Sequence, residues 1–235
     1  MTAALLETDA LTAFYGDFQA LFGISMRLDE GETIAIIGAN GAGKSTFLRS
    51  LTGLNRAPRE DSIRFAGTPI GAAPPEGIVG LGMAMVPEGR RLFPSLTVEE
   101  NLLIGGYARR KGPWSLAQIY ALFPALRERR TAPATALSGG QQQMVAIGRA
   151  LMSNPRLLLC DEISLGLAPI VIRDIYAALP TITGAGATLV VVEQDINQAL
   201  RVADRVYCFQ EGRVSLKGRP QELTRDQITA AYFGV

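Results

Sequence analysis

A glycine-rich stretch that follows an apolar segment carries the residues with the most specific chemistry. Gly38 is followed after four residues by Gly43, Lys44 and Ser45, which is the pattern of a phosphate-binding loop. Glycine lets backbone N–H groups turn around phosphate oxygens, and a helix start adds a dipole that favours anions. Lys44 would neutralise the β- and γ-phosphates, Ser45 would coordinate Mg²⁺, and Thr46 would reach the α-phosphate. The predicted nucleotide-binding residues are Gly38, Asn40, Gly41, Ala42, Gly43, Lys44, Ser45 and Thr46.

A second group of candidate residues follows an apolar run later in the chain. Asp161 and Glu162 come directly after residues 157–160, so they would lie at the carboxyl end of a buried strand, where open α/β sheets bind ligands. Asp161 is predicted to hold Mg²⁺, directly or through water. Glu162 is predicted to accept a proton from the attacking water, because the chain contains no histidine to do so. The alternative is that the two acids only cap a loop.

A third segment, residues 137–141, reads LSGGQ and precedes a helical pattern of apolar residues. The hydroxyl of Ser138 and the first N–H groups of that helix would form a second anion site. One chain cannot readily place two phosphate-binding segments on one nucleotide, whereas two chains that face each other head to tail can. The sequence therefore favours a paired arrangement of chains.

The composition indicates a globular protein without a general affinity for polyanions. The chain has 235 residues, 48% of them hydrophobic, and a formal net charge of +1. That length fits one large domain or two small lobes. The near-neutral charge gives no electrostatic reason to expect a nucleic-acid partner. The absence of histidine excludes a histidine-based catalytic triad or zinc site.

Cysteine usage and hydropathy favour a cytoplasmic location. Cys160 and Cys208 lie in apolar runs and are expected to be buried free thiols of a reducing compartment. No apolar run approaches the roughly 20 residues that a membrane-spanning helix requires. The N-terminal residues lack a basic flank and include Glu7 and Asp9, which is unlike a secretory signal. Attachment to a membrane would therefore depend on another protein.

The elements that must position these residues alternate between strands and helices, which predicts a mostly parallel sheet. The first 30 residues instead look like short antiparallel strands, with turns at Gly16, Gly23 and residues 29–31. The expected architecture is an α/β core with an antiparallel appendage and an inserted helical lobe. The expected strands are 33–37, 62–65, 83–86, 157–160, 188–192, 206–209 and 213–216, and the expected helices are 44–51, 98–130 with interruptions, 138–152, 170–179, 196–202 and 225–232.

The motifs and their order resemble those of the nucleotide-binding subunit of an ATP-binding cassette (ABC) transporter, over essentially the whole chain. The resemblance implies an α/β fold in which a P-loop NTPase core carries an antiparallel β subdomain and an inserted α-helical subdomain. It implies one domain over residues 1–235, with the core in 1–89 and 138–235 and the helical subdomain in about 90–137. It also implies ATP and Mg²⁺ as cofactors, ATP hydrolysis coupled to transport, and contact between the helical subdomain and membrane subunits.

The resemblance assigns roles to further residues. Tyr15 resembles the aromatic residue that stacks on adenine. Ser138 and Gly140 would contact the γ-phosphate that the partner subunit binds, and Gly139 and Gln141 belong to the same signature segment. The loop of residues 165–168 would cross the dimer.

Two positions depart from the most common family pattern. Glu88 aligns with a glutamine that contacts magnesium and water, and Gln194 aligns with a switch histidine. Gln194 can donate a hydrogen bond to the γ-phosphate as histidine does, but it cannot carry a proton away. Hydrolysis would then depend on Glu162 and on positioning. The alternative is that Gln194 only caps a turn, beside the predicted N-cap Asp195.

Three segments of the chain resemble the smaller ATPase of branched-chain amino acid importers, and a related branch of that group serves urea and short amides. The segments are VPEGRRLFPSLTVEENL, DEISLGLAP and VVEQDINQAL. Ile163 departs from the proline that commonly follows the two acids. The implied partners are a second ABC ATPase of the same or a different chain, two transmembrane permeases and an external solute-binding protein. The subunit would lie on the cytoplasmic face of the membrane. Phe93 and Leu96 would contact the membrane part, or else only pack under the helical lobe.

Two other function classes remain open from the sequence. One is a regulatory module that closes on ATP with little turnover. Glu88 and Gln194 favour this possibility, whereas Glu162 argues against it. The other is a soluble cassette protein of translation or DNA repair. Such proteins usually carry paired cassettes or long coiled-coil insertions, and neither is present here.

Overall fold

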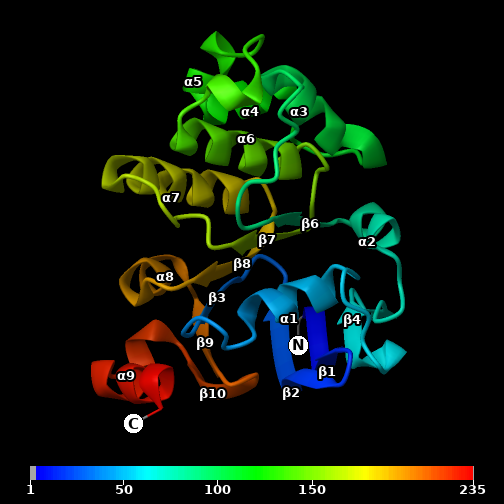
Figure 1. Cartoon of the computed structure of the whole chain (residues 1–235), viewed down its shortest axis with the longest axis vertical. Helices are drawn as coiled ribbons and strands as arrows, with labels where there is room; N and C mark the ends of the chain where they lie inside the picture. Colours follow the sequence, from blue (N-terminus) through cyan, green and yellow to red (C-terminus); the bar gives the residue numbers. More distant parts are fainter. Residues whose placement is uncertain (1–3, 235) are drawn as a thin grey trace. The chain divides into compact units, whose positions relative to one another are not determined.

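The computed structural model describes residues 4–234, so residues 1–3, which belong to the region predicted as antiparallel strands, and residue 235 lie outside the described residues. The chain divides into two compact units (Figure 1). Unit 1 combines the chain up to residue 78 with the chain from residue 188 onward. Unit 2 comprises residues 79–187.

Unit 1 contains an antiparallel sheet with the strand order β2-β1-β4-β5. Its strands are β1 (Ala4–Tyr15), β2 (Phe18–Asp29), β4 (Ile63–Phe65) and β5 (Thr68–Pro69), with the short 3-10 helix η1 (Glu60–Ser62) before β4. The predicted antiparallel appendage is thus confirmed. The predicted turn at Gly23 is wrong, because Gly23 lies inside β2 as the extra residue between the pairs Leu11–Ile24 and Thr12–Phe22. Its φ of 86° suits a β-bulge that only glycine adopts readily.

Unit 1 also contains a run of buried strands that carries the phosphate-binding loop. Strand β3 (Thr33–Ile37) pairs in parallel with both β8 (Thr188–Glu193) and β9 (Arg205–Gln210), and β10 (Arg213–Gly218) pairs antiparallel with β9. Every residue of β3 and β8 is buried, as expected for strands covered on both faces. Helices α1 (Lys44–Leu51), α8 (Ile196–Val202) and α9 (Arg225–Phe233) complete this unit, with the 3-10 helix η4 (Pro220–Glu222) before α9. These elements and their pairing confirm the prediction.

Unit 2 combines one parallel strand pair with a set of helices. Strand β6 (Met83–Val86) pairs in parallel with β7 (Leu157–Asp161). Helix α2 (Pro75–Leu81) spans the boundary between the units. The other helices are α3 (Val98–Gly105), α4 (Leu116–Leu122), α5 (Pro124–Glu128), α6 (Gly139–Leu151) and α7 (Pro169–Gly184), with the 3-10 helices η2 (Gly106–Ala108) and η3 (Ala134–Ala136). Residues 98–130 are helical with interruptions, as predicted, and η3 follows beyond that range. Helix α7 runs five residues past the predicted end at 179 despite Pro180 within it.

Helices α3 and α6 are in close backbone contact, which two glycines permit. A Cβ atom at Gly105 would overlap the carbonyl oxygen of Arg149. A Cβ atom at Gly148 would lie 2.8 Å from methyl carbons of both Leu102 and Ile119, closer than real side chains approach. The two helices therefore approach each other closely, by backbone contact at Gly105 and by side-chain contact at Gly148.

The loop before α3 is held by one buried amide side chain. Asn101 has no exposed surface. Its Oδ1 accepts a hydrogen bond from the backbone N–H of Phe93, and its Nδ2 donates to the carbonyls of Phe93, Leu96 and Thr97 at 2.9 to 3.2 Å. The sequence analysis did not single out Asn101, because an asparagine in a helical pattern carries no signal of its tertiary partners.

The two cysteines agree with the sequence expectation. Cys160 and Cys208 are both buried free thiols, in β7 and β9 respectively. Burial raises the pKa of the Cys208 thiol, so at neutral pH it is protonated. Among the described residues, no helix combines the length and apolar character that crossing a bilayer requires.

We predict that Asn101→Ala lowers the free energy of unfolding by about 3 kcal/mol, because it removes the four hydrogen bonds that this buried side chain makes to the backbone of residues 93–97. Chemical denaturation followed by circular dichroism measures this. Asn197→Ala, an exposed position on α8, is the matched control and should change the free energy of unfolding by less than about 0.5 kcal/mol. Equal effects of the two substitutions would contradict the prediction.

Candidate nucleotide site

The phosphate-binding loop of unit 1 runs from the end of β3 into the start of α1. Lys44, the first residue of α1, is 4% exposed, and its Nζ donates hydrogen bonds to the carbonyls of Gly38 (2.7 Å) and Ala39 (3.1 Å). These bonds hold the ammonium group over the loop. Gly43 caps the helix in the left-handed conformation, with φ of 97°. The positive charge and the helix start thus face the same space, which suits a polyphosphate.

The loop is shaped by close approaches that only glycine allows. A Cβ atom at Gly38 would overlap the carbonyl oxygen of Phe209 in β9. A Cβ atom at Gly43 would lie 2.8 Å from Leu21 Cδ2 and 3.3 Å from the carbonyl oxygen of Ala20, both in β2. By contrast, nothing lies within 4 Å of a Cβ atom at Gly41, so that glycine faces open space. The loop is therefore packed on one side and open on the other.

A glycine that the sequence analysis did not single out connects the loop to its surroundings. Gly212, in the turn between β9 and β10, donates its N–H to the carbonyl of Ala42 (3.0 Å) and accepts from the N–H of Phe22 (2.9 Å). A Cβ atom at Gly212 would overlap the carbonyl oxygen of Ala20. With φ of 71°, Gly212 therefore joins the phosphate-binding loop, the β9–β10 turn and β2 by backbone contacts. Sequence showed only a hairpin turn there, because these partners are distant in the chain.

Tyr15 lies at the end of β1 and reaches the same loop. Its side chain is 45% exposed, and its hydroxyl lies 3.4 Å from the Oγ1 of Thr46. Phe18 pairs with Tyr15 across the hairpin and is 69% exposed. A planar base could stack on an exposed aromatic ring in this position while its phosphates extend toward the loop. The structure thus brings Tyr15 and residues 38–46 together within unit 1.

Gln194 is placed by the register of two parallel strands. Ile37 pairs with Glu193, so Gly38 and Gln194 are the next residues at the same edge of the sheet. Asp195 accepts hydrogen bonds from the N–H groups of Asn197 and Gln198, which confirms it as the N-cap of α8. Because Asp195 caps the helix, the turn does not need the amide of Gln194 for that purpose. This placement favours the functional interpretation of Gln194 over the capping one.

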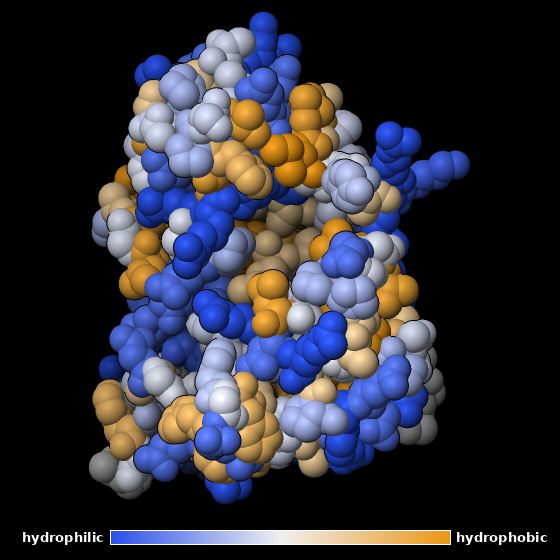
Figure 2. Space-filling model, turned by 45° about the vertical axis from the view of Figure 1, so that its right-hand side comes forward, coloured by the Kyte–Doolittle hydropathy of each residue, from blue (hydrophilic) through white to orange (hydrophobic). Residues whose placement is uncertain are grey.

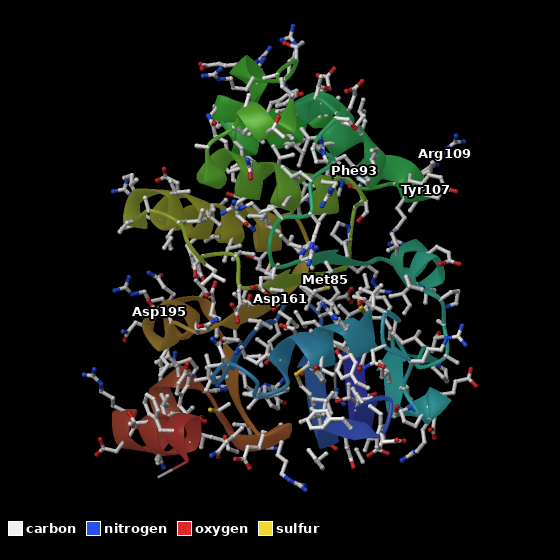
Figure 3. The ribbon with its side chains drawn as sticks, in the orientation of Figure 1. Met85, Phe93, Tyr107, Arg109, Asp161 and Asp195 are labelled. Atoms are coloured by element: carbon white, nitrogen blue, oxygen red, sulfur yellow. The ribbon has the colours of Figure 1, made fainter. Side chains whose placement is uncertain are left out.

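In unit 2, the acidic residues follow neighbouring strands. Val86 of β6 pairs with Cys160 of β7, so Glu88 and Asp161 both come just after this pair at the same edge. Asp161 is 3% exposed and ends β7 (Figure 3), whereas Glu88 is exposed. Glu162 is half-buried and adopts φ of 49°, a left-handed conformation that costs about 1 kcal/mol or more for a residue other than glycine. Strain of this kind often occurs where a side chain must be aimed at a ligand.

The segment of residues 138–141 begins α6 in unit 2. Ser138 is the N-cap: its Oγ accepts from the N–H of Gln141 (3.3 Å), and its own N–H donates to the Oε1 of Gln141 (3.1 Å). This capping box uses the serine oxygen as an acceptor, so the hydroxyl proton is not part of it. Gly140 has no room for a side chain, because a Cβ atom would overlap Val171 of α7. The first turn of α6 thus offers a serine hydroxyl and backbone N–H groups to an anion.

The residues proposed for Mg²⁺ supply suitable donors. Ser45, Glu88 and Asp161 offer one hydroxyl and two carboxylates, and Mg²⁺ prefers oxygen donors with some positions filled by phosphates and water. No cluster of three or more His, Cys, Asp or Glu residues that could hold a metal by itself occurs in the described part of the chain.

Comparisons with known proteins agree with this geometry. Residues 21–164 match the family model described as ABC transporter. The chain is 45% identical over 233 residues to the high-affinity branched-chain amino acid transport ATP-binding protein BraG of Pseudomonas aeruginosa, covering 98% of this chain and all of the relative.

Solved structures show the same fold. The ADP conformation of the ATP-binding cassette MJ1267 superposes with a TM-score of 0.84 at 28% identity and covers both chains completely. The dimeric post-hydrolysis state of the cassette MJ0796 bound to ADP and Pi superposes with a TM-score of 0.81 at 26% identity, covering 92% of this chain and 98% of that one. These similarities confirm the predicted fold class and the resemblance that the motifs indicated.

We predict that Gly212→Ala weakens ATP binding about tenfold, because the added Cβ must push the β9–β10 turn away from β2 and disturb the carbonyl of Ala42 in the loop. Isothermal titration calorimetry measures the dissociation constant. Gly67→Ala is the matched control, since Gly67 also has positive φ (80°) but nothing lies within 4 Å of its Cβ position. Equal ATP affinity of the two variants would contradict the prediction, because the contact between Gly212 and β2 would then have no effect on binding.

Proposed function

Because the chain belongs to the ABC transporter family and is an ATP-binding, ATP-hydrolysing cassette, we propose that it powers an importer of branched-chain amino acids. The observation that carries this proposal is the 45% identity to BraG over nearly the full length of both chains. Glu88 and Gln194, the two positions that depart from the common family pattern, agree with this assignment.

We propose that the domain is organised as one cassette, with a core in residues 1–89 and 138–235 and a helical subdomain in residues 90–137. The helical composition of residues 98–136 supports the second part of this division. In this arrangement, the phosphate-binding loop and Gln194 belong to the core, and the surface that meets the membrane subunits belongs mainly to the helical subdomain.

ATP would bind to unit 1 through its base and its phosphates. Tyr15 would stack on adenine, while Thr46, linked to the Tyr15 hydroxyl, would contact the α-phosphate. Lys44 would neutralise the β- and γ-phosphates, and the N–H groups of residues 38–46 would donate to their oxygens. Mg²⁺, when bound, supplies further positive charge to the phosphates, and Ser45, Glu88 and Asp161 would hold it.

Hydrolysis would require a base, a donor to the γ-phosphate and a rigid frame. Glu162 would accept the proton of the attacking water, and its left-handed backbone would aim the carboxylate. Gln194 would donate a hydrogen bond to the γ-phosphate from the edge next to Gly38. Because phosphoryl transfer depends mostly on positioning and electrostatics, an amide can fill this place without itself accepting a proton.

The nucleotide-binding site would be completed by a second ATPase chain. Ser138, Gly139 and Gly140 would contact the γ-phosphate that the facing chain holds on its own Lys44 or the equivalent lysine, and residues 165–168 would lie along the dimer. Gly166 has φ of 70° and Leu165 is 49% exposed, as expected for a loop free to meet another chain. The solved dimer of a related cassette bound to ADP and Pi supports this pairing.

The membrane partners would meet an exposed apolar surface of unit 2, which we call the docking surface and define as Phe93, Leu103, Ile104 and Tyr107. These residues are 46%, 50%, 42% and 87% exposed, respectively, whereas Asn101 and Leu102 of the same segment are buried. Figure 2 shows apolar side chains gathered on the forward face over these helices, and Figure 3 places Phe93 and Tyr107 on the α3 side. Leu96, by contrast, is half-buried, which favours packing under the lobe for that residue.

Such a surface suits permease segments at the cytoplasmic face of the membrane. We therefore propose a peripheral location there, with two transmembrane permeases, a second ABC ATPase and an external solute-binding protein. The solute itself would contact the binding protein and the permeases and not this subunit.

We predict that Glu162→Gln lowers kcat for ATP hydrolysis at least 100-fold, because the amide cannot accept a proton, while ATP affinity is retained. Phosphate release and calorimetry measure the two quantities. With turnover blocked, ATP should convert monomers into a stable dimer on size-exclusion chromatography. Glu222→Gln, an exposed substitution in η4, is the control and should turn over normally. An unchanged rate in Glu162→Gln would favour a regulatory module over an ATPase.

The solute assignment makes a separate prediction. Deleting this subunit should abolish high-affinity uptake of radiolabelled leucine, isoleucine and valine, and the wild-type chain should restore it, whereas Glu162→Gln should not. Uptake of urea and acetamide should be unaffected by the deletion. Loss of urea or amide uptake with normal leucine uptake would instead assign the subunit to the amide branch.

A further inference from the structure

Arg149, which no sequence motif singled out, lies where three parts of unit 2 meet. It is in the last turn of α6, the helix that begins at Ser138. Its Nη1 donates to the carbonyl of Arg91 (2.7 Å) and its Nη2 donates to the carbonyl of Arg90 (2.9 Å). A planar guanidinium can make these two bonds at once, whereas a lysine ammonium is a single point charge.

The segment that Arg149 holds has an unusual backbone. Gly89, Arg90 and Arg91 adopt φ of 73°, 65° and 47°, so three consecutive residues are left-handed and two of them are not glycine. A left-handed arginine is unfavourable by about 1 kcal/mol or more and persists only where its surroundings impose it. The two charge-assisted hydrogen bonds from Arg149 supply that restraint. The segment directly follows Glu88, so restraining it also restrains the position of Glu88.

Arg149 also contacts both sides of the docking surface. Its guanidinium carbon lies 5.7 Å from the centroid of the Phe93 ring, within the range of a cation–π contact. The backbone carbonyl of Arg149 lies against Gly105, so a Cβ atom at Gly105 would overlap the carbonyl oxygen. Gly105 is the last residue of α3 and directly follows Leu103 and Ile104. A displacement of Phe93 or of the end of α3 would therefore act on Arg149 directly.

The other end of the same segment reaches the start of α6. Arg90 Nη1 donates to the Oε1 of Gln142 (3.3 Å). The Arg90 guanidinium also covers Gly139, since a Cβ atom there would lie 3.2 Å from Nη2. Arg90 and Arg149 thus tie residues 90–91 to both ends of the helix that carries the Ser138 segment. The docking surface, the segment after Glu88 and the start of α6 form one connected set of contacts.

We propose that Arg149 is a positioning residue. It would transmit the binding of a membrane-embedded partner at the docking surface to the Ser138 end of α6. The inference rests on the proposed function, because it requires a permease that seats there. Packed interfaces of this kind shift as units and do not deform gradually, so a small displacement of Phe93 or α3 would move the segment and the helix together. Burial lowers the pKa of the Arg149 guanidinium, but an arginine remains charged near neutral pH.

The test compares Arg149→Met with Arg149→Lys in the assembled transporter. Methionine keeps length and apolar packing but removes both hydrogen bonds and the charge, whereas lysine keeps a positive charge at the end of α6 and reaches one carbonyl. Arg129→Met, an exposed position in the same unit, is the matched control. Three quantities are measured: the stimulation of ATPase rate by solute-loaded binding protein, co-purification with the permeases, and ATP-driven dimerisation in a Glu162→Gln background.

We expect Arg149→Met to reduce the stimulation at least fivefold, Arg149→Lys to show an intermediate loss, and Arg129→Met to behave as wild type. Co-purification and dimerisation of the Arg149 variants should stay within twofold of wild type, since every residue of the docking surface and of the Ser138 segment is retained. A residue that only stabilises the fold would instead lower dimerisation, co-purification and melting temperature together.

If the wild type is stimulated normally, two results overturn the inference and leave the proposed function intact. One is that joint loss, and the other is full stimulation of Arg149→Met. A wild-type chain that binds no permease and shows no stimulation overturns the proposed function, and the inference with it. The two failures are therefore distinguishable.

Discussion

The structure of the nucleotide site depends on backbone contacts between the phosphate-binding loop and strands that are distant in the sequence. Gly38 lies against the carbonyl of Phe209, and Gly43 and Gly212 both lie against Ala20. Below them, the rings of Phe47 and Phe209 pack edge to face with centroids 5.3 Å apart. Because backbone atoms cannot rearrange as side chains do, the loop has one shape. In the binding mode that we propose, this rigidity would let Lys44 and the N–H groups of the loop face the phosphates without a reorganisation cost at the moment of reaction.

The chemistry is divided between the two units, and each unit carries an incomplete set of groups. Unit 1 has Tyr15, which we propose to stack on adenine, together with the phosphate-binding loop and Gln194. Unit 2 has the acidic residues after β6 and β7 and the start of α6, which we propose to bind an anion. In the mechanism that we propose, Glu162 would accept the proton of the attacking water, since the chain has no histidine to do so.

Sequence was sufficient for the elements and motifs but not for the contacts that hold them. The strand at 33–37, the helix at 44–51 and the cap at Asp195 were predicted correctly, because hydrophobic periodicity and capping chemistry are local properties. The predicted turn at Gly23 was wrong because a glycine in a strand can equally mark a bulge. The tertiary contacts of Gly212, Asn101 and Arg149 were not predicted, because each of these residues acts on residues that lie far away in the sequence. No local pattern distinguishes an arginine on a helix surface from one that binds two carbonyls of another loop.

The central claim is that a nucleotide held by the phosphate-binding loop of one chain is completed by the Ser138 segment of the facing chain. The most direct measurement uses a hydrolysis-blocked transporter in which this chain carries Ser138→Arg and the facing ATPase, distinguishable by a tag, is unchanged. Photolabelling with azido-ATP reports which chain holds nucleotide. We expect the label to disappear from the facing chain and to remain on the chain that carries the substitution. Loss of label from the substituted chain, with the facing chain still labelled, would contradict the account.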